Sequence, residues 1–459
     1  MAEHSVTVEN TLQTLLTDKK YSTIRDILVT MNPADIAAVF AGVEPDKLPL
    51  LFRLLPKELA AESFVEMESE EQESLIKGIS DKELRQVMDE LYVDDAVDIV
   101  EEMPANVVQR ILAQADPEMR KEINEILQYP EDSAGSVMTT EYVKLTPDMT
   151  VGDAILRIRR TGVDKETIYT CYVLQNRLLV GTVSVKSLLL APSDLQTIDS
   201  IMESNLITVT THTDQEEVAR MMSKYNLLAI PVVDGDNRMV GIVTFDDAMD
   251  VVEEETTEDM EIMAGMTPSD KTYLRSSPID LFLHRIPWLS LLMISATFTG
   301  MIISGFEKAL ASMTCLAAFI PMLMDTGGNS GSQSSVTVIR ALSLGELEFS
   351  DLGKVIWKEI RTALICGACL SVLCFAKVML VDRLLMGNEE VSIMVAVVVG
   401  LTLAVTVLCA KLVGCTLPML AKKLGFDPAV MASPFITTIV DALSLLVYFG
   451  IATSPLKIT

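Results

Sequence analysis

Asp441 is the residue whose type and position most clearly suggest chemistry, because it lies midway along an otherwise uncharged and mostly apolar run, residues 431–452. That run is long enough to span a bilayer as a helix. A carboxylate at bilayer depth is costly and normally faces a bundle interior, a water-filled cavity or a cation. The sequence therefore predicts a cation site in a membrane pathway. The alternative is an ion pair with Lys377 or Lys411 on another helix.

Another apolar run is interrupted by polar residues between Pro321 and Gln333. This stretch contains Asp325, Asn329 and three glycines. Proline and glycine at bilayer depth permit close helix approach or local unwinding. Asn329 and Asp441 supply amide and carboxylate oxygens, which hard cations prefer, and a wet cavity suits Mg2+ because Mg2+ gives up its water reluctantly. For Asp325, pore lining and a helix–helix hydrogen bond are both open.

These residues need helices that cross the membrane. Five apolar segments are predicted to do so, at residues 286–304, 314–339, 361–381, 391–412 and 429–453. The links after the second and fourth segments are basic, which places them in the cytoplasm, with the N-terminal half cytosolic and the C-terminus outside. The first residues are polar, so no signal peptide is expected and insertion would depend on the first span.

The net charge of -28 lies almost entirely in the first 270 residues, so an acidic half precedes a nearly neutral apolar half. This acidity argues against nucleic acid as a partner. Such a charge density repels itself in the compact state, which bound divalent cations or solvation alone would relieve.

Residues 1–130 are predicted to be helical throughout, with a weak repeat. The sequence Pro56-Lys57-Glu58-Leu59 is echoed at residues 81–84 and 104–107, and each copy leads into an amphipathic helix, which indicates a superhelical array. Asp94 and Asp98 share one face at the head of a helix. They either complement the helix dipole or share a cation with another domain.

Residues 137–250 contain a clearer repeat, in which Val180-Gly181-Thr182-Val183 corresponds to Val240-Gly241-Ile242-Val243. Each copy alternates short β-branched runs with a helix, near residues 154–160 and 218–225. The segment resembles a tandem pair of cystathionine-β-synthase (CBS) modules, which fold as β-α-β-β-α units. Because such modules often bind adenine nucleotides, the resemblance makes ATP a candidate ligand.

An acidic helix is predicted from Phe245 to Ala264. Its acids lie on two neighbouring faces, with Asp247, Asp250 and Glu254 on one and Glu255, Glu258 and Asp259 on the other. Like charges at these spacings destabilise an isolated helix. The segment is either a solvated linker or a rod positioned by divalent cations that bridge it to other acids. Asp214 and Glu216, at the start of a helix in the second repeat, are further candidates.

Taken together, these features resemble the MgtE family of bacterial magnesium channels and transporters along nearly the whole chain. Two membrane motifs carry the resemblance: the Gly-Gly-Asn-x-Gly-x-Gln core within residues 321–340, and Asp427-Pro428 followed by Ser433-Pro434 and Asp441. The resemblance implies a multi-domain membrane protein. Its parts would be an all-α superhelical domain at 1–130, an α/β tandem CBS pair at 131–250, an acidic plug helix at 251–278 and five transmembrane helices at 279–459.

The resemblance also implies a homodimer in the bacterial cytoplasmic membrane, with one Mg2+ pore on the twofold axis lined by Asp441 and Asn329. Cytosolic Mg2+ would bridge the plug helix to the CBS and N-terminal domains and hold the pore closed. The implied regulatory acids are Asp94, Asp98, Asp214, Glu216, Asp247, Asp250, Glu255, Glu258, Asp259 and Asp427. Asn226 stands where the family can carry an acid, which puts one regulatory site in doubt.

Two other functions remain open: an exchanger that couples Mg2+ to Na+ or H+, and a membrane-anchored nucleotide sensor built on the CBS pair. An enzyme is not expected, because the sequence shows no nucleophile–base set and no phosphate-binding loop.

Overall fold

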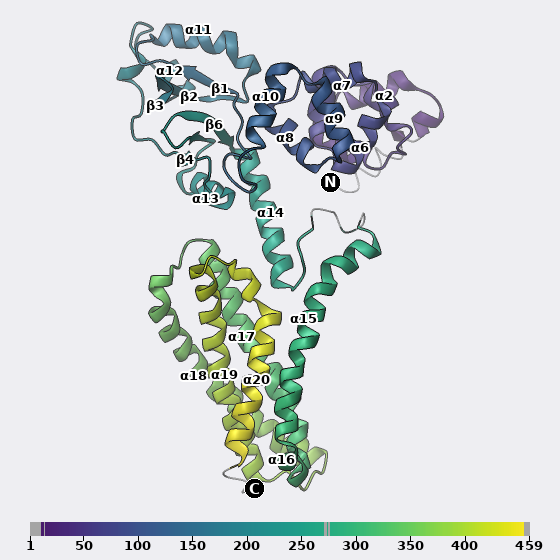
Figure 1. Ribbon diagram of the computed structural model, residues 1–459, viewed down its shortest axis with the longest axis vertical. Coiled ribbons are helices and arrows are strands. Elements are labelled where there is room, and N and C mark those ends of the chain that lie inside the picture. The colour runs from purple at the N-terminus through teal and green to yellow at the C-terminus, as the bar shows by residue number, and fades with distance from the viewer. Residues whose placement is uncertain (1–10, 13, 270–272, 274–275, 454–459) are drawn as a thin grey trace. The chain divides into compact units, whose positions relative to one another are not determined.

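The computed structural model describes residues 11–12, 14–269, 273 and 276–453. The chain forms two units, Met1–Val252 and Glu253–Thr459. Figure 1 labels their helices and strands. The predicted outer limits at residues 1 and 459 lie outside the described residues.

The first unit begins with an array of short helices. They are α2 (Tyr21–Leu28), α3 (Pro33–Phe40), α4 (Leu48–Phe52), α5 (Lys57–Val65), α6 (Ser69–Gly78), α7 (Asp81–Met88), α8 (Val93–Glu102), α9 (Ala105–Gln114) and α10 (Pro117–Ile126). Alternate helices stack, α3 on α5, α5 on α7 and α7 on α9, around buried side chains such as Phe40 and Phe64. The predicted repeat is confirmed, because its copies begin α5, α7 and α9.

Two three-stranded sheets of the same topology follow. Their strands are β1 (Tyr142–Leu145), β2 (Thr167–Gln175) and β3 (Leu178–Ser184), then β4 (Val209–Thr210), β5 (Ala229–Val233) and β6 (Met239–Thr244). In each sheet the first two strands are parallel and the last two antiparallel, with Cys171 opposite Val183 in one and Ile230 opposite Val243 in the other. The helices are α11 (Val151–Thr161), α12 (Val185–Leu189) and α13 (Gln215–Tyr225), with short 3-10 turns at Gly162–Asp164 and Ile198–Ser200. The predicted internal repeat is confirmed.

The acidic helix is α14 (Phe245–Met263), one residue shorter than predicted. It occupies the place that the short α12 has in the first copy. Pro192 follows α12 closely and cannot continue a helix, whereas residues 245–264 contain neither proline nor glycine. The chain turns at Gly265, where φ is +73°.

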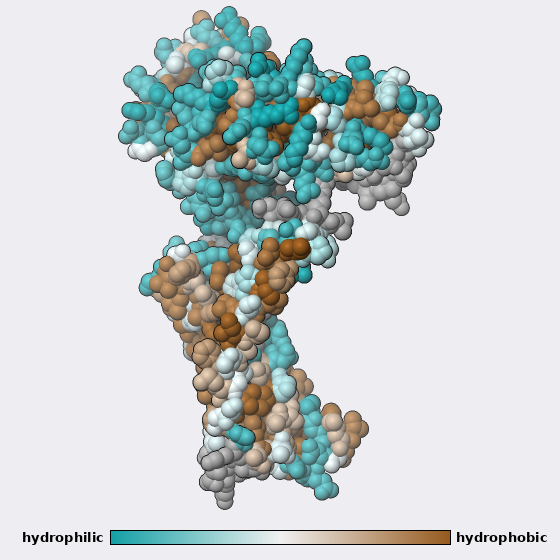
Figure 2. All heavy atoms as spheres, turned by 45° about the vertical axis from the view of Figure 1, so that its right-hand side comes forward, coloured by the Kyte–Doolittle hydropathy of each residue, from teal (hydrophilic) through white to brown (hydrophobic). Residues whose placement is uncertain are grey.

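The second unit is a helical bundle with an apolar surface, coloured brown in Figure 2. Its helices are α15 (Pro278–Gly305), α16 (Glu307–Ser312), α17 (Ile320–Ser343), α18 (Leu352–Lys377), α19 (Ile393–Lys423) and α20 (Ser433–Thr453). Short 3-10 turns lead into three of them, at Thr314–Phe319, Phe349–Asp351 and Pro428–Met431, and a π-helix at Val378–Leu385 extends α18. Among the described residues, four segments are long and apolar enough to cross a membrane, namely Pro278–Gly305, Phe349–Leu385, Ile393–Lys423 and Pro428–Thr453.

The remaining predicted span is α17, whose 24 residues pack against α19 and α20. Polar and small residues make α17 less hydrophobic than the other long helices of the bundle. Its buried glycines and serines are in contact with the neighbouring helices, and this packing holds α17 in the bundle. Helices extend beyond the predicted membrane segments, since α18 begins at Leu352, ahead of residue 361, and α19 continues to Lys423, past residue 412. Charged residues marked the ends in the sequence, but long basic side chains are tolerated in such helices when they reach water or a partner.

Candidate cation site and acidic contacts

Glycines let α17 approach α19 and α20 closely. A Cβ atom on Gly327 would lie 2.7 Å from Thr406 Cγ2 and 2.8 Å from Ser444 Oγ, and one on Gly331 would lie 2.8 Å from Ile436 Cγ2. Because α17 is continuous from Ile320 to Ser343, these glycines serve close approach and not unwinding.

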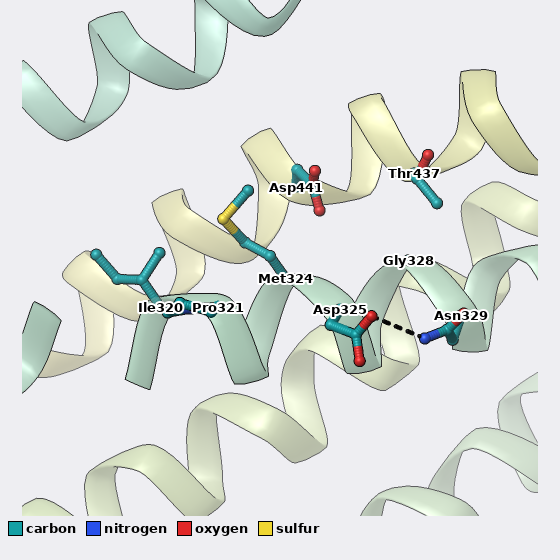
Figure 3. A pocket seen from close by; sticks show the side chains of 8 residues that line it. All are labelled: Ile320, Pro321, Met324, Asp325, Gly328, Asn329, Thr437 and Asp441. Carbon is teal, nitrogen blue, oxygen red and sulfur yellow. Dashed lines mark hydrogen bonds between the residues drawn. The ribbon is translucent and has the colours of Figure 1, made fainter. Parts of the chain in front are cut away.

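A cavity of about 440 Å³ lies between α17 and α20 (Figure 3). Its lining residues are Ile320, Pro321, Met324, Asp325, Gly328, Asn329, Thr437 and Asp441. Asn329 comes from α17 and Asp441 from α20, so the structure brings both predicted pore residues to one cavity. Asp325, whose role the sequence left open, lines it too.

Four of the eight lining residues, Asp325, Asn329, Thr437 and Asp441, carry side-chain oxygen atoms. Asn329 Nδ2 donates a hydrogen bond to Asp325 Oδ1 at 3.1 Å, and Thr437 Oγ1 donates to the Pro434 carbonyl at 2.9 Å. One Asn329 N–H and the Thr437 O–H are thus engaged, while carboxylate, amide and hydroxyl oxygens of the lining keep free lone pairs. Oxygen ligands of this kind are those that Mg2+ prefers, directly or through its waters.

The two lysines that could have neutralised Asp441 are paired elsewhere. Lys411 Nζ lies 3.9 Å from Glu359 Oε2, and Lys377 Nζ lies 2.9 Å from Asp382. Within the described part of the chain, no ion pair is formed with Asp441. This removes the alternative explanation for a carboxylate at this depth.

In the first unit, α8 presents its acids to the start of α14. Asp94 is 6% exposed, and burial followed by the Asp247 carboxylate raises its pKa well above the usual value. Loss of hydration and then Asp247 raise the pKa of the more exposed Asp98 to about 8. Asp247 itself accepts hydrogen bonds from the Thr244 backbone amide and hydroxyl. The structure thus brings Asp94, Asp98 and Asp247, which the sequence singled out on two different helices, close enough to interact electrostatically.

Three further carboxylates belong to this contact and were missed from the sequence. Asp95 follows Asp94, while Glu141 and Glu166 immediately precede the parallel neighbours β1 and β2. Glu141 accepts a hydrogen bond from the Val93 amide at 3.2 Å, and Glu166 Oε2 is buried without a hydrogen-bond partner among the described residues. Predicting that β1 and β2 pair would have placed Glu141 and Glu166 at one sheet edge.

Among the described residues, no group of three His, Cys, Asp or Glu side chains has the geometry to hold a metal ion. The carboxylates of α8 and α14 therefore crowd one another without forming a closed coordination shell. Crowding of like charges favours either protonation or a bridging cation.

The C-terminal end of α14 belongs to the second unit and packs within it. Ile262 and Met263 pack against Ile339, Ala429 and Ala432. This apolar contact anchors the helix end beside the start of α20.

Two acids face each other at this contact. Asp259 Oδ2 accepts a hydrogen bond from Ser343 at 3.5 Å, and burial followed by Asp427 raises the pKa of Asp259. Asp427 caps the turn before α20 by accepting from the Ala429 amide at 2.7 Å. The structure therefore places Asp259 and Asp427, two of the predicted regulatory acids, close enough for their charges to interact.

The remaining predicted acids have simpler positions. Asp214 is the N-cap of α13, accepts from the Glu216 and Glu217 amides and lies near Asp132. Glu216 lies in the first turn, where a helix dipole favours acids. Asp250, Glu255 and Glu258 lie along α14 between its two ends.

Without divalent cations, the first unit should be more stable at pH 6 than at pH 8. Burial raises the pKa of Asp95 to about 7 and that of Glu166 to about 8. Folded carboxyls then keep protons that the unfolded chain releases, so stability falls as pH rises through this range. In EDTA, calorimetry of the full chain should show the unfolding midpoint of residues 1–252 falling by about 3 °C or more from pH 6 to pH 8.

Saturating Mg2+ should flatten this dependence, because the ion would take over the role of the protons. The variant Asp95→Asn with Glu166→Gln should flatten it too. A midpoint that rises from pH 6 to pH 8 in EDTA would show that these acids do not crowd one another as described.

An array of short helices, a pair of repeated α/β modules and a bundle of apolar helices around an acid-lined cavity define a multi-domain membrane protein of the cation-transport class. Family models match accordingly: the MgtE intracellular N domain at residues 31–132, the CBS domain at 134–194 and 198–254, and a divalent cation transporter domain at 320–451.

The chain is 36% identical to the magnesium transporter MgtE of Thermus thermophilus over 446 residues, covering 96% of this chain and 97% of the relative. It is 34% identical to the Bacillus subtilis magnesium transporter MgtE, covering 96% and 95%. The solved cytosolic domain of the Mg2+ channel MgtE in complex with ATP has a TM-score of 0.51 and 36% identity, covering 53% of this chain and 99% of that one. This chain belongs to the MgtE family.

Proposed function

We propose that this protein moves Mg2+ across the bacterial cytoplasmic membrane through the cavity between α17 and α20. The observation that carries the proposal is the placement of Asp441 and Asn329 on opposite sides of one cavity while Lys377 and Lys411 are paired elsewhere. The full-length similarity to proteins described as magnesium transporters supports it.

The path is completed by a second copy of the chain. On a single subunit, Asp325 and Asn329 are exposed, and α15 has no buried residue. A carboxylate turned toward lipid is costly. A homodimer that encloses this face would line a single pore with oxygen atoms from both subunits.

Cytosolic Mg2+ closes the pore through α14. At low Mg2+ the carboxylates at both ends of α14 repel their neighbours, and at high Mg2+ bridging ions favour the compact, closed arrangement. A ligand shifts such an equilibrium only by binding one state better, and a full swing needs about 5 kcal/mol, which several weak sites could share. The acids are Asp94, Asp98, Asp214, Glu216, Asp247, Asp250, Glu255, Glu258, Asp259 and Asp427.

This mechanism assigns 1–130, 131–250 and the connecting segment 251–278 to the cytosol and 279–459 to the membrane, with the C-terminus outside. The helical part of that segment ends at Met263, with α14, and not at residue 278 as predicted. The basic links after the second and fourth spans support that orientation. ATP is a second ligand in the proposal, at the CBS pair, because the similar cytosolic domain was solved in complex with ATP. Calorimetric titration of the full chain with ATP would test this.

Proteoliposomes that carry the wild-type chain test the transport proposal. With a Mg2+ gradient but no Na+ or H+ gradient, Mg2+ should enter, and the rate should fall as Mg2+ at the cytosolic face is raised. No uptake at low cytosolic Mg2+ would overturn the proposal. Uptake that requires a Na+ or H+ gradient would identify an exchanger instead.

Restoring an acid at Asn226 should strengthen inhibition by Mg2+. Asn226 ends α13 in the left-handed region, with φ 53° and ψ 47°, a conformation that Asp also tolerates. Asn226→Asp adds a charge at almost constant shape, so the half-inhibitory cytosolic Mg2+ concentration should fall by roughly two- to fivefold, equivalent to below about 1 kcal/mol. Asn226→Gly keeps the backbone without the acid, and an equal shift in that variant would show that charge is not the cause.

A further inference from the structure

We propose that Asp325 is a specificity-determining residue of the Mg2+ path, which adds a second carboxylate to the cavity and orients the Asn329 amide. The inference rests on the proposed transport function. It goes beyond that function because it assigns a role to Asp325, in addition to the pore residues Asp441 and Asn329.

The placement of Asp325 decides between the two roles that the sequence left open. Its carboxylate lines the same cavity as Asp441, and its hydrogen bond runs to Asn329, one turn further along α17 (Figure 3). The bond is within one helix, so it does not tie α17 to a neighbour. Asp325 is also exposed on the subunit. A carboxylate that held two packed helices together would be buried between them.

The hydrogen bond fixes which end of the Asn329 amide faces the ion. An ionised carboxylate only accepts hydrogen bonds, so the group that Asn329 directs at Asp325 Oδ1 must be its NH2. The amide oxygen then points away from Asp325 and is available to Mg2+ or to its waters. Without this acceptor the amide could turn, and its NH2 group would repel a cation.

The charge of Asp325 acts on selectivity. Coulomb attraction is proportional to the charge of the ion, so a second carboxylate stabilises a divalent cation twice as strongly as a monovalent one at the same position. Because Lys411 and Lys377 are engaged with Glu359 and Asp382, their charges are already balanced locally. In the proposed dimer, Asp325 and Asp441 would surround the path with four carboxylates.

The test compares Asp325→Asn with wild type in proteoliposomes, with Mg2+ uptake and Na+ uptake measured in parallel. Asp325→Asn should raise the half-saturating Mg2+ concentration about tenfold and lower the Mg2+/Na+ selectivity by a similar factor, with a smaller change in maximal rate. Asp325→Glu should recover most of the selectivity because it restores the charge. Glu389→Gln is the matched control, since Glu389 is an exposed acid that does not line the cavity.

A double-mutant cycle tests the orienting role, because residues that act through one another have non-additive effects. Asn329→Ala should change the half-saturating Mg2+ concentration much less in the Asp325→Ala background than in wild type, because alanine removes the acceptor that asparagine would keep. If Asp325→Asn folds but keeps wild-type saturation and selectivity, or matches Glu389→Gln, the inference is wrong while the transport proposal stands. If Asp325→Asn does not fold, Asp325→Glu and Asp325→Ser replace it. Asp325→Glu should then keep the wild-type Mg2+/Na+ selectivity and Asp325→Ser should lose it. A wild-type Mg2+/Na+ selectivity in Asp325→Ser would overturn the inference.

Discussion

Replacing Asp441 with Asn should reduce Mg2+ uptake by about 100-fold or more. The substitution keeps the shape of the side chain and removes the charge that the α20 wall contributes to the cavity. The attraction between two unit charges about 4 Å apart is about 4 kcal/mol at an effective dielectric constant of about 20, and each 1.4 kcal/mol is a factor of ten, so loss of the Asp441 charge should nearly abolish cation binding. Uptake into proteoliposomes containing a Mg2+-sensitive dye measures the effect.

Ser444→Ala is the matched control for Asp441→Asn. Ser444 lies on the same helix, is buried, donates to the Val440 carbonyl at 2.6 Å and does not line the cavity. It should retain uptake within a few fold of wild type. Near-normal uptake in Asp441→Asn would mean that Mg2+ crosses by a path that avoids this cavity.

The second large effect is expected at Lys411, where Lys411→Met should destabilise the membrane unit by about 3–5 kcal/mol. Lys411 is 6% exposed, and its ammonium group donates to Ser334 Oγ at 3.2 Å, while Ser334 donates to Glu359 at 2.7 Å. Removing the lysine leaves Glu359 as an unbalanced charge inside the bundle. Unfolding of the detergent-solubilised protein, followed by tryptophan fluorescence, measures the loss.

The double variant Lys411→Met with Glu359→Leu should recover most of this stability, because a buried ion pair replaced as a unit is often neutral. Lys377→Met provides the comparison, since the Lys377 side chain is 46% exposed and exposed pairs contribute roughly 0–1 kcal/mol. Equal losses for Lys411→Met and Lys377→Met would contradict the buried-pair interpretation.

The helices of both units could be predicted because local spacing specifies them. α14 ends within one residue of its prediction, since the acidic run lacks breakers until Gly265. The end of α19 could not be placed in the same way. Lys411 resembles a helix terminus in the sequence, and only the packing of α17, α18 and α19 reveals its partner Glu359.

The candidate site shows the same division. The rarity of polar and ionisable side chains in apolar segments singled out Asp441 and Asn329, a purely local signal. The role of Asp325 depends on which atoms lie beside it, and Glu141 and Glu166 reach the α8–α14 contact only because β1 and β2 pair. Such long-range proximity has no counterpart in residue spacing.

The most direct test of the account is the current through a planar bilayer that contains the wild-type chain, with Mg2+ as the only permeant cation. A passive Mg2+ path predicts a reversal potential that shifts by about 30 mV for each tenfold change in the Mg2+ gradient, as expected for two charges. It should not respond to Na+ or pH gradients, and the current should disappear in Asp441→Asn. A reversal potential that follows the Na+ or H+ gradient, or an undiminished current in Asp441→Asn, would contradict it.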